Sequence, residues 1–222
     1  MNKLKIIITG ATGMVGEGVL LACLQNETVS EILMVNRRHY ALNHPKLSEL
    51  LIENFNTISE EQQIKLNGYD ACFYCAGISS VGMKEEKYSY ITYETTLHFA
   101  QILYKLNPSM VFNFVSGQAT DRSENGKLMW ARVKGKTENA LIKIGFKGQY
   151  NFCPGFMKPL KGQKNVKFIF TFFGLWFPTI FPKISLTLLQ VGQAMVNSCL
   201  HGYDKQILEV QDIKKLASIS NS

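Results

Sequence analysis

Residues 4–16, LKIIITGATGMVG, decide the fold of this 222-residue chain. The run over residues 4–9 is apolar and rich in β-branched isoleucine, and it ends at a glycine, which predicts a buried strand. Apolar residues then recur at helical spacing over residues 14–26. A strand, a tight turn and a helix in direct succession predict the start of an α/β fold with a parallel sheet.

The turn carries glycines at three-residue intervals, and each has a physical task. One permits unusual dihedral angles, one lets the backbone approach a pyrophosphate, and one lets the helix pack closely on the strand. The helix N-terminus adds unpaired N–H groups and a positive dipole end. We therefore expect a dinucleotide to bind here, in contact with Gly10, Thr12, Gly13, Met14, Val15 and Gly16.

The end of the second predicted strand indicates which dinucleotide. An enzyme that uses NAD usually has Asp or Glu there, to accept hydrogen bonds from the adenosine ribose. This chain has Asn36, Arg37 and Arg38 instead. No carboxylate in this stretch repels a 2′-phosphate and two guanidinium groups can bind one, so we expect NADP rather than NAD. The alternative is that both arginines are ordinary surface residues.

Helices and strands alternate along the rest of the chain. Apolar runs predict strands at residues 30–35, 48–53, 70–75, 109–115, 149–153 and 207–210, and helical spacing predicts helices at 60–66, 84–106, 127–144 and 185–200. Strands that are apolar on both faces indicate a parallel sheet covered on both sides. We expect one doubly wound Rossmann domain over residues 1–222, with a small C-terminal extension on the substrate side.

The composition limits which partners and which cellular compartment we expect for this protein. The formal net charge is +7, but the lysines are dispersed and no aromatic-basic signature accompanies them, so we expect no nucleic-acid partner. A short first apolar run and five cysteines without a disulfide framework favour the cytoplasm. The histidines lack metal-ligand spacing and Cys72 and Cys75 have no second pair, so we expect no metal site.

From Thr9 to the region of Pro154 the chain resembles the short-chain dehydrogenase/reductase superfamily, in its extended or atypical branch. More narrowly it is similar to epimerase/dehydratase-type proteins related to the Tat-interacting oxidoreductase-like group, and more distantly to NmrA-like sensors. The resemblance implies that a nicotinamide dinucleotide contacts four further segments. These are Asn54 and Phe55 near the adenine, Cys75, Ala76 and Gly77 after the fourth strand, Lys134 at the ribose, and Pro154 and Gly155 near the carboxamide. It also implies that Ser116 binds the substrate oxygen.

The chain departs from the superfamily at its active-site motif, Y-x-x-x-K. The lysine of that motif holds the nicotinamide ribose and lowers the tyrosine pKa, and residues four apart share one helix face. Here Lys134 is intact, but Trp130 stands at the tyrosine position. An indole N–H only donates hydrogen bonds and does not ionise usefully near neutral pH. We thus expect Ser116, Lys134 and Trp130 at the catalytic positions, without the usual acid/base.

Two other sources of a proton stay open. One of Tyr88, Tyr90 and Tyr93 could bring a phenol into the site, although ordinary packing explains these residues better. Lys134 itself could act as the acid if it is desolvated, because burial shifts lysine towards the neutral form.

Residues 168–182 are the most aromatic part of the chain. The densest run is shorter than the about 20 residues that a spanning helix needs and is interrupted by prolines, so we expect no transmembrane segment. In extended members of the superfamily the corresponding part, residues 156–205 here, covers the nicotinamide end. We rank a pocket lid first, a homodimer contact second and a membrane-surface contact third.

These observations leave two functions. The first is an NADP-dependent oxidoreductase or epimerase-type enzyme that acts on a small carbonyl or hydroxyl compound of unknown identity, oriented by Ser116 and Lys134. The second is a non-catalytic regulatory or protein-interaction module that senses NADP(H). Trp130 favours the second function, and the retained Ser116 and Lys134 favour the first.

Overall fold

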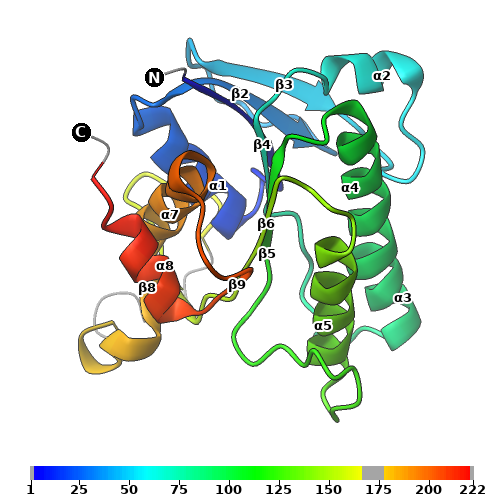
Figure 1. Cartoon of the computed structure of the whole chain (residues 1–222), viewed down its shortest axis with the longest axis vertical. Coiled ribbons are helices and arrows are strands. Elements are labelled where there is room, and N and C mark those ends of the chain that lie inside the picture. Colours follow the sequence, from blue (N-terminus) through cyan, green and yellow to red (C-terminus); the bar gives the residue numbers. More distant parts are fainter. Residues whose placement is uncertain (1–2, 167–177, 221–222) are drawn as a thin grey trace.

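The computed structural model describes residues 3–166 and 178–220 (Figure 1). Its strands are β1 (Leu4–Thr9), β2 (Val29–Asn36), β3 (Leu47–Leu51), β4 (Ala71–Tyr74), β5 (Val111–Val115), β6 (Gly148–Phe152), β7 (Phe156–Lys158), β8 (Ser185–Thr187) and β9 (Ile207–Leu208). Its helices include α1 (Met14–Gln25), α2 (Glu60–Lys65), α3 (Glu85–Ser89), α4 (Thr95–Leu106), α5 (Met129–Ile142), α7 (Leu188–His201) and α8 (Val210–Ala217).

The main sheet is parallel throughout and has seven strands in the order β3-β2-β1-β4-β5-β6-β9. Its inner strand β1 is covered on both faces, because consecutive side chains point to opposite faces and Ile6, Ile7 and Ile8 are all fully buried. This arrangement confirms the doubly wound Rossmann fold expected from the sequence.

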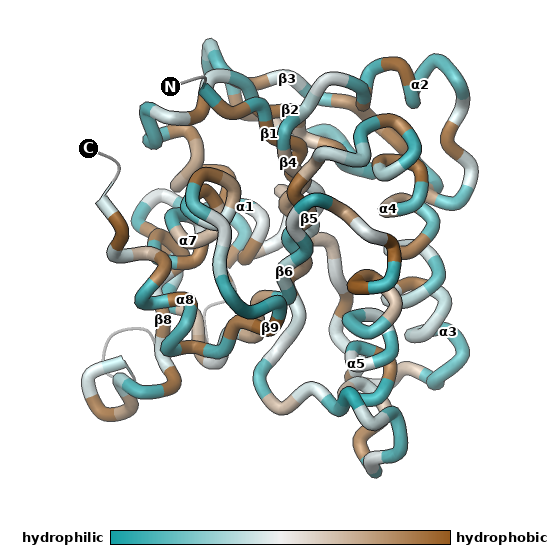
Figure 2. The backbone as a smooth tube through the Cα atoms, in the orientation of Figure 1, coloured by the Kyte–Doolittle hydropathy of each residue, from teal (hydrophilic) through white to brown (hydrophobic). Residues whose placement is uncertain are grey.

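Helices cover the sheet in two layers, α1, α7 and α8 on one side and α3, α4 and α5 on the other (Figure 1). Each layer has its own apolar core. Val19, Val191 and Ile213 pack in one core, and Phe99 and Leu141 in the other. Figure 2 shows hydrophobic stretches along the central strands between these layers. The middle of the sheet is therefore buried on both faces, which explains why residues 6–8 of β1 and all of β4 are apolar without alternation.

The chain changes direction across the sheet between β1 and β4. It runs outward from β1 through β2 to β3, and then returns to the other side of β1 with β4. The loops after β1 and β4 therefore leave the same edge in opposite directions. In open α/β sheets such a switch point leaves a crevice at the carboxyl ends of the strands, where ligands bind.

The helix predicted over residues 84–106 is interrupted. A π-helical turn, Tyr90–Glu94, separates α3 from α4. The N–H of Thr95 donates to the carbonyl of Tyr90 five residues before it, and the Thr95 hydroxyl donates to the same carbonyl at 2.9 Å. The two halves together still cover the expected length.

The C-terminal part differs more from expectation. Residues 185–187 are not helical but form β8, which pairs with β7, and neither strand was predicted. The final strand ends at Leu208, because Glu209 caps an unpredicted helix, α8. The aromatic segment at 168–182 falls outside the described residues up to position 177, and the single-domain assignment and the lid role of residues 156–205 remain predictions.

No helix among residues 3–166 and 178–220 is long and apolar enough to cross a membrane.

Candidate cofactor and active site

The glycine turn is built by close approach of backbone to backbone. Gly10 has a φ of +72°, and a Cβ placed there would lie 2.7 Å from the backbone nitrogen of Ala76, just after β4. A Cβ at Gly16 would overlap the carbonyl oxygen of Gly10. A Cβ at Gly13 would meet only that same oxygen, at 3.4 Å. The protein's own packing thus requires Gly10 and Gly16, whereas the space beside Gly13 is open.

Helix α1 begins directly after Gly13, whose N–H donates to the carbonyl of Gly10 at 2.9 Å. The first N–H groups of a helix have no acceptor within it, and the helix dipole gives this end a partial positive charge. Thr12, Met14 and Val15 line a cavity at this point. The first turn of α1 therefore presents a site suited to an anion.

Two adjoining cavities lie beyond the turn, towards β2 and β3. The nearer one is lined by Gly10, Thr12, Gly13, Val35, Asn36, Arg37, Arg38, Phe55, Cys75, Ala76 and Gly77. The farther one shares Arg37, Phe55, Ala76 and Gly77 with it and adds Glu53, Asn54, Asn56 and Tyr90 among others. The structure thus brings together the residues expected at the adenosine end, although they come from four separate loops.

Arg37 and Arg38 are exposed, and neither forms an ion pair with a carboxylate within the part of the chain that the structure describes. A carboxylate does lie close to the end of β2, which the sequence analysis missed because it comes from β3. Glu49 accepts hydrogen bonds from the Asn36 side chain and the Tyr40 N–H, both at 3.0 Å, and from His39.

Burial alone would raise the pKa of Glu49, but these hydrogen bonds outweigh it and lower the pKa. Glu49 is not among the residues that line either adenosine-end cavity. Its charge is therefore already engaged by the protein.

A third cavity lies on the other side of the glycine turn. Ser116 and Lys134 line it, together with Thr12, Gly13, Met14, Val15, Cys75, Ala76, Gly77, Ile78, Val115, Met157, Lys164, Asn165 and Val166. Lys134 is half-buried on α5, and its Nζ donates to the carbonyl of Ser116 at 3.0 Å. Burial lowers the pKa of Lys134 to about 8, against the attraction of Glu138 and Cys153.

The hydroxyl of Ser116 is engaged away from this cavity. It donates to the carboxylate of Glu138, one helical turn after Lys134 on α5, and Glu138 is fully buried. A serine has one hydroxyl hydrogen, so this bond leaves only lone pairs of Ser116 for a ligand. Helix α5 thus holds Ser116 twice, by its carbonyl through Lys134 and by its hydroxyl through Glu138.

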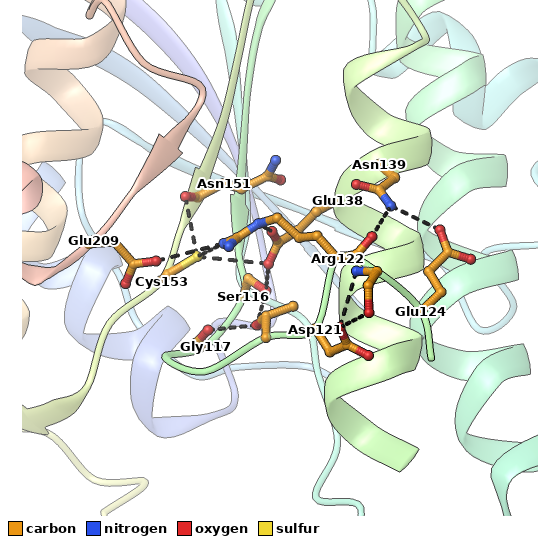
Figure 3. Close-up of polar contacts among 12 residues, drawn as sticks. Ser116, Gly117, Asp121, Arg122, Glu124, Glu138, Asn139, Asn151, Cys153 and Glu209 are labelled. Atoms are coloured by element: carbon orange, nitrogen blue, oxygen red, sulfur yellow. Dashed lines mark hydrogen bonds and ion pairs between the residues drawn. The ribbon is translucent and has the colours of Figure 1, made fainter. Parts of the chain in front are cut away.

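Arg122 neutralises the buried carboxylate (Figure 3). Its Nε donates to Glu138 at 2.6 Å, and Nη2 lies 3.2 Å from the sulfur of Cys153 and 3.8 Å from Glu209. The cluster ties α5 to the segments that follow β5, β6 and β9. Sequence reasoning missed Glu138 and Arg122, and the only available signal was the helical spacing of Glu138 from Lys134.

Trp130 lies at the start of α5, and a Cβ placed at Gly117 would be 3.8 Å from its Cζ3 atom. The indole therefore lies beside Gly117, the residue that follows Ser116, but Trp130 is not among the described residues that line the third cavity.

The three tyrosines considered as substitutes lie elsewhere. Tyr90 is at the adenosine end, where its hydroxyl accepts from Asn56 at 3.0 Å. Tyr88 is buried, and Tyr93 stacks under Lys136 at 4.3 Å. Among the described residues no phenol lines the cavity that holds Ser116 and Lys134.

Pro154 and Gly155 are not brought to the walls of these three cavities. The carbonyl of Pro154 accepts from the N–H of Gln118 at 3.1 Å. Gly155 faces the carbonyl of Ile184, so its small size serves packing between the loop after β6 and the segment before β8.

Comparison with known families and structures gives a consistent placement. A model of the NAD dependent epimerase/dehydratase family matches residues 6–134. The leucinostatins biosynthesis cluster protein T of Purpureocillium lilacinum is 30% identical over 141 residues, which are 63% of this chain and 51% of that protein. The chain therefore spans about half the length of this relative.

Several solved structures share the fold, two of them of epimerases. The ADP-L-glycero-D-manno-heptose-6-epimerase of Helicobacter pylori has a TM-score of 0.66 at 13% identity, over 94% of this chain and 76% of that one. The UDP-N-acetylglucosamine 4-epimerase of Bacillus cereus has a TM-score of 0.64 at 15% identity, over 96% and 84%. The enzyme WbmF of Bordetella bronchiseptica, solved with NAD+, has a TM-score of 0.66 at 13% identity, over 98% and 77%. At these identities the likeness is one of fold.

Proposed function

We propose that this chain, which belongs to the NAD dependent epimerase/dehydratase family, binds NADP(H) and catalyses hydride transfer to or from a small carbonyl or hydroxyl compound. The observation that carries the proposal is the row of three cavities with shared walls. It runs from Phe55 and Arg37, past the open side of Gly13, to Ser116 and Lys134. A dinucleotide laid along this row has its pyrophosphate at the N-terminus of α1.

The preference for NADP rests on charge at the adenosine end. Asn36 is neutral, and the exposed guanidinium groups of Arg37 and Arg38 have no carboxylate partner in the described residues. Of the two anions nearby, Glu49 is already held by three donors, whereas Glu53 is exposed and lines the farther cavity together with Arg37. A 2′-phosphate in the nearer cavity, whose described lining holds both arginines and no carboxylate, would therefore meet two cations.

At the other end the residues can orient a substrate and move a proton. The cofactor supplies the hydride chemistry when bound. Lys134 is placed to donate to ribose hydroxyls, and its lowered pKa of about 8 makes it the candidate proton donor. Ser116 can accept a hydrogen bond from a ligand hydroxyl, because its own hydrogen is committed to Glu138.

A non-catalytic NADP(H)-sensing module is the second candidate, and two observations favour it. The serine hydrogen that would polarise a substrate carbonyl points to Glu138, and no phenol lines the cavity among the described residues. A sensor would bind NADPH without consuming it in the presence of a broad panel of aldehydes and ketones. Cofactor oxidation above the rate of a Lys134→Met variant would exclude this candidate.

The cofactor assignment is tested by calorimetric titration with NADPH and NADH. We expect NADPH to bind at least about tenfold more tightly, and the double variant Arg37→Ala/Arg38→Ala to lose that preference while it keeps its NADH affinity. The matched control, Lys143→Ala/Lys147→Ala, removes the same charge from exposed positions outside the cavities. Equal affinities in the wild type, or an equal loss in the control, would overturn the preference for NADP.

A further inference from the structure

We propose that Lys164 is a further cofactor-binding residue, which contacts the pyrophosphate from the side opposite the glycine turn, and that Glu17 positions it. The inference rests on the proposed function, because it needs a bound dinucleotide. It concerns residues 163–166, which we name the strap, and the first turn of α1.

Glu17 accepts the hydrogen bonds that hold the strap on α1. It lies in the first turn of α1 and is fully buried. Its two carboxylate oxygens accept from the consecutive N–H groups of Lys164 and Asn165, each at 2.7 Å, and one of them also accepts from the Tyr40 hydroxyl at 2.7 Å. A buried carboxylate is costly unless it is hydrogen-bonded, so these donors make the contact specific.

Gln163 adds a second attachment at the same turn. Its side-chain nitrogen donates to the carbonyl of Met14 at 2.7 Å, and its side-chain oxygen accepts from the N–H of Leu160 at 2.6 Å. The strap is thus fixed on α1 beside the N–H groups that face the cavity, although about 150 residues separate the two segments.

The placement of the strap brings the side chain of Lys164 to the cavity. Its backbone is fixed by Glu17, its side chain is exposed, and it lines the same cavity as Gly13, Met14 and Val15. The described lining of that cavity contains two lysines, Lys134 and Lys164, and no carboxylate. Lys134 is held at the carbonyl of Ser116 on the far side. Among the described residues that line this cavity, Lys164 is therefore the cation available to an anionic group at the start of α1.

The glycine turn and the strap would then share the pyrophosphate. The turn offers backbone N–H groups and a dipole, which are fixed, and the strap offers a full positive charge. Glu17 brings a negative charge into the first turn of α1, and this charge repels a bound anion. The positive charge of Lys164 offsets that repulsion. The ligand class is a nucleoside diphosphate, whichever nicotinamide dinucleotide carries it.

The test compares Lys164→Met with Lys161→Met, a matched loss of charge at an exposed lysine that lines none of the three cavities. Affinities for NADPH and NADH are measured by calorimetry at low and high salt. We expect Lys164→Met to weaken both cofactors by about tenfold relative to the control, and the loss to shrink at high salt. The affinities for both cofactors should fall by the same factor, because both cofactors contain the pyrophosphate.

Two results would overturn the inference while the proposed function stands. One is an affinity of Lys164→Met within twofold of Lys161→Met for both cofactors. The other is a loss confined to NADPH, which would place Lys164 at the 2′-phosphate. A wild-type protein that binds neither cofactor would instead overturn the proposed function, and the inference with it.

Glu17→Gln tests the positioning role separately. The amide has one accepting oxygen in place of two, so one strap N–H loses its partner. We expect faster hydrogen exchange at the amides of Lys164 and Asn165, weaker binding of both cofactors and restored protection when NADPH saturates the variant. Unchanged exchange and affinity in a folded Glu17→Gln protein would contradict the role.

Discussion

The two ends of the site are built by different means. The phosphate-binding end uses backbone, because Gly10, Gly13 and the start of α1 form it through close approach and unpaired N–H groups. The reaction end uses side chains from separate elements, and Ser116 and Arg122 both donate hydrogen bonds to Glu138. A backbone site is encoded by a short contiguous stretch, whereas a side-chain site depends on partners that are remote in sequence.

The largest effect should come from the backbone end, at Gly13. A Cβ there would meet only the carbonyl oxygen of Gly10, at 3.4 Å, and the extended φ of −108° is accessible to any residue. Gly13→Val should bind NADPH at least about 1,000-fold more weakly, about 4 kcal/mol, with little change in thermal stability.

Gly16→Val is the contrasting variant, because its side chain would overlap the carbonyl of Gly10 and should destabilise the fold itself. Unchanged NADPH affinity in folded Gly13→Val protein would show that the glycine turn is only structural.

Arg122→Met should have the next largest effect, on the side-chain end. Glu138 is fully buried, whereas the Arg122 side chain is 33% exposed. Removal of Arg122 leaves a buried carboxylate without its cation, which should cost about 3 kcal/mol of the free energy of unfolding. Glu138→Gln should cost less, because Arg122 still reaches water and Glu209. Urea denaturation of both variants gives the comparison, and equal costs would contradict it.

Lys134 should give the reaction end a distinct pH dependence. Burial lowers its pKa to about 8, so between about pH 8 and 10 the unfolded chain holds a proton that the folded chain has released. The free energy of unfolding should therefore rise with pH across this window, by about 2 kcal/mol more in the wild type than in Lys134→Met. Parallel curves for the two proteins would show that Lys134 titrates normally.

The smallest effect expected is a gain of function in Trp130→Tyr. The indole lies beside Gly117 but outside the cavity wall, so a phenol there would reach a substrate oxygen only in part. General acids contribute about 10²–10⁴-fold, and we expect about tenfold faster reduction of small aldehydes. Trp130→Phe is the matched control because it lacks only the hydroxyl. Equal rates in the two variants would exclude the phenol as a proton donor.

The sequence predicted the fold well because the fold depends on local patterns. Isoleucines in succession at residues 6–8 and glycines at 10 and 16 require a covered strand and a tight turn. The family match agrees with the resemblance found in the sequence. The misses lie where tertiary pairing decides. Residues 185–187 look like the start of a helix, yet they are extended because β7 lies beside them.

The candidate site was predictable in part for the same reason. The glycine turn and the arginines after β2 are adjacent in sequence, and Lys134 follows from a motif. Glu138, Glu49 and Glu17 were missed, since each is a carboxylate on a regular element whose partners come from other strands and loops. Helical or strand spacing alone does not tell a buried acceptor from a solvated charge.

The widened turn at Tyr90–Glu94 makes chain length, as well as residue identity, a determinant of the adenosine end. Such a turn holds one residue more than an ordinary helical turn. Deletion of one residue within it would let α3 and α4 run on as one regular helix, with everything before the deletion rotated by about 100° around the axis. Tyr90 would then turn away from Asn56, which it now contacts at 3.0 Å. The extra residue therefore sets the direction in which Tyr90 faces Asn56 in the loop after β3.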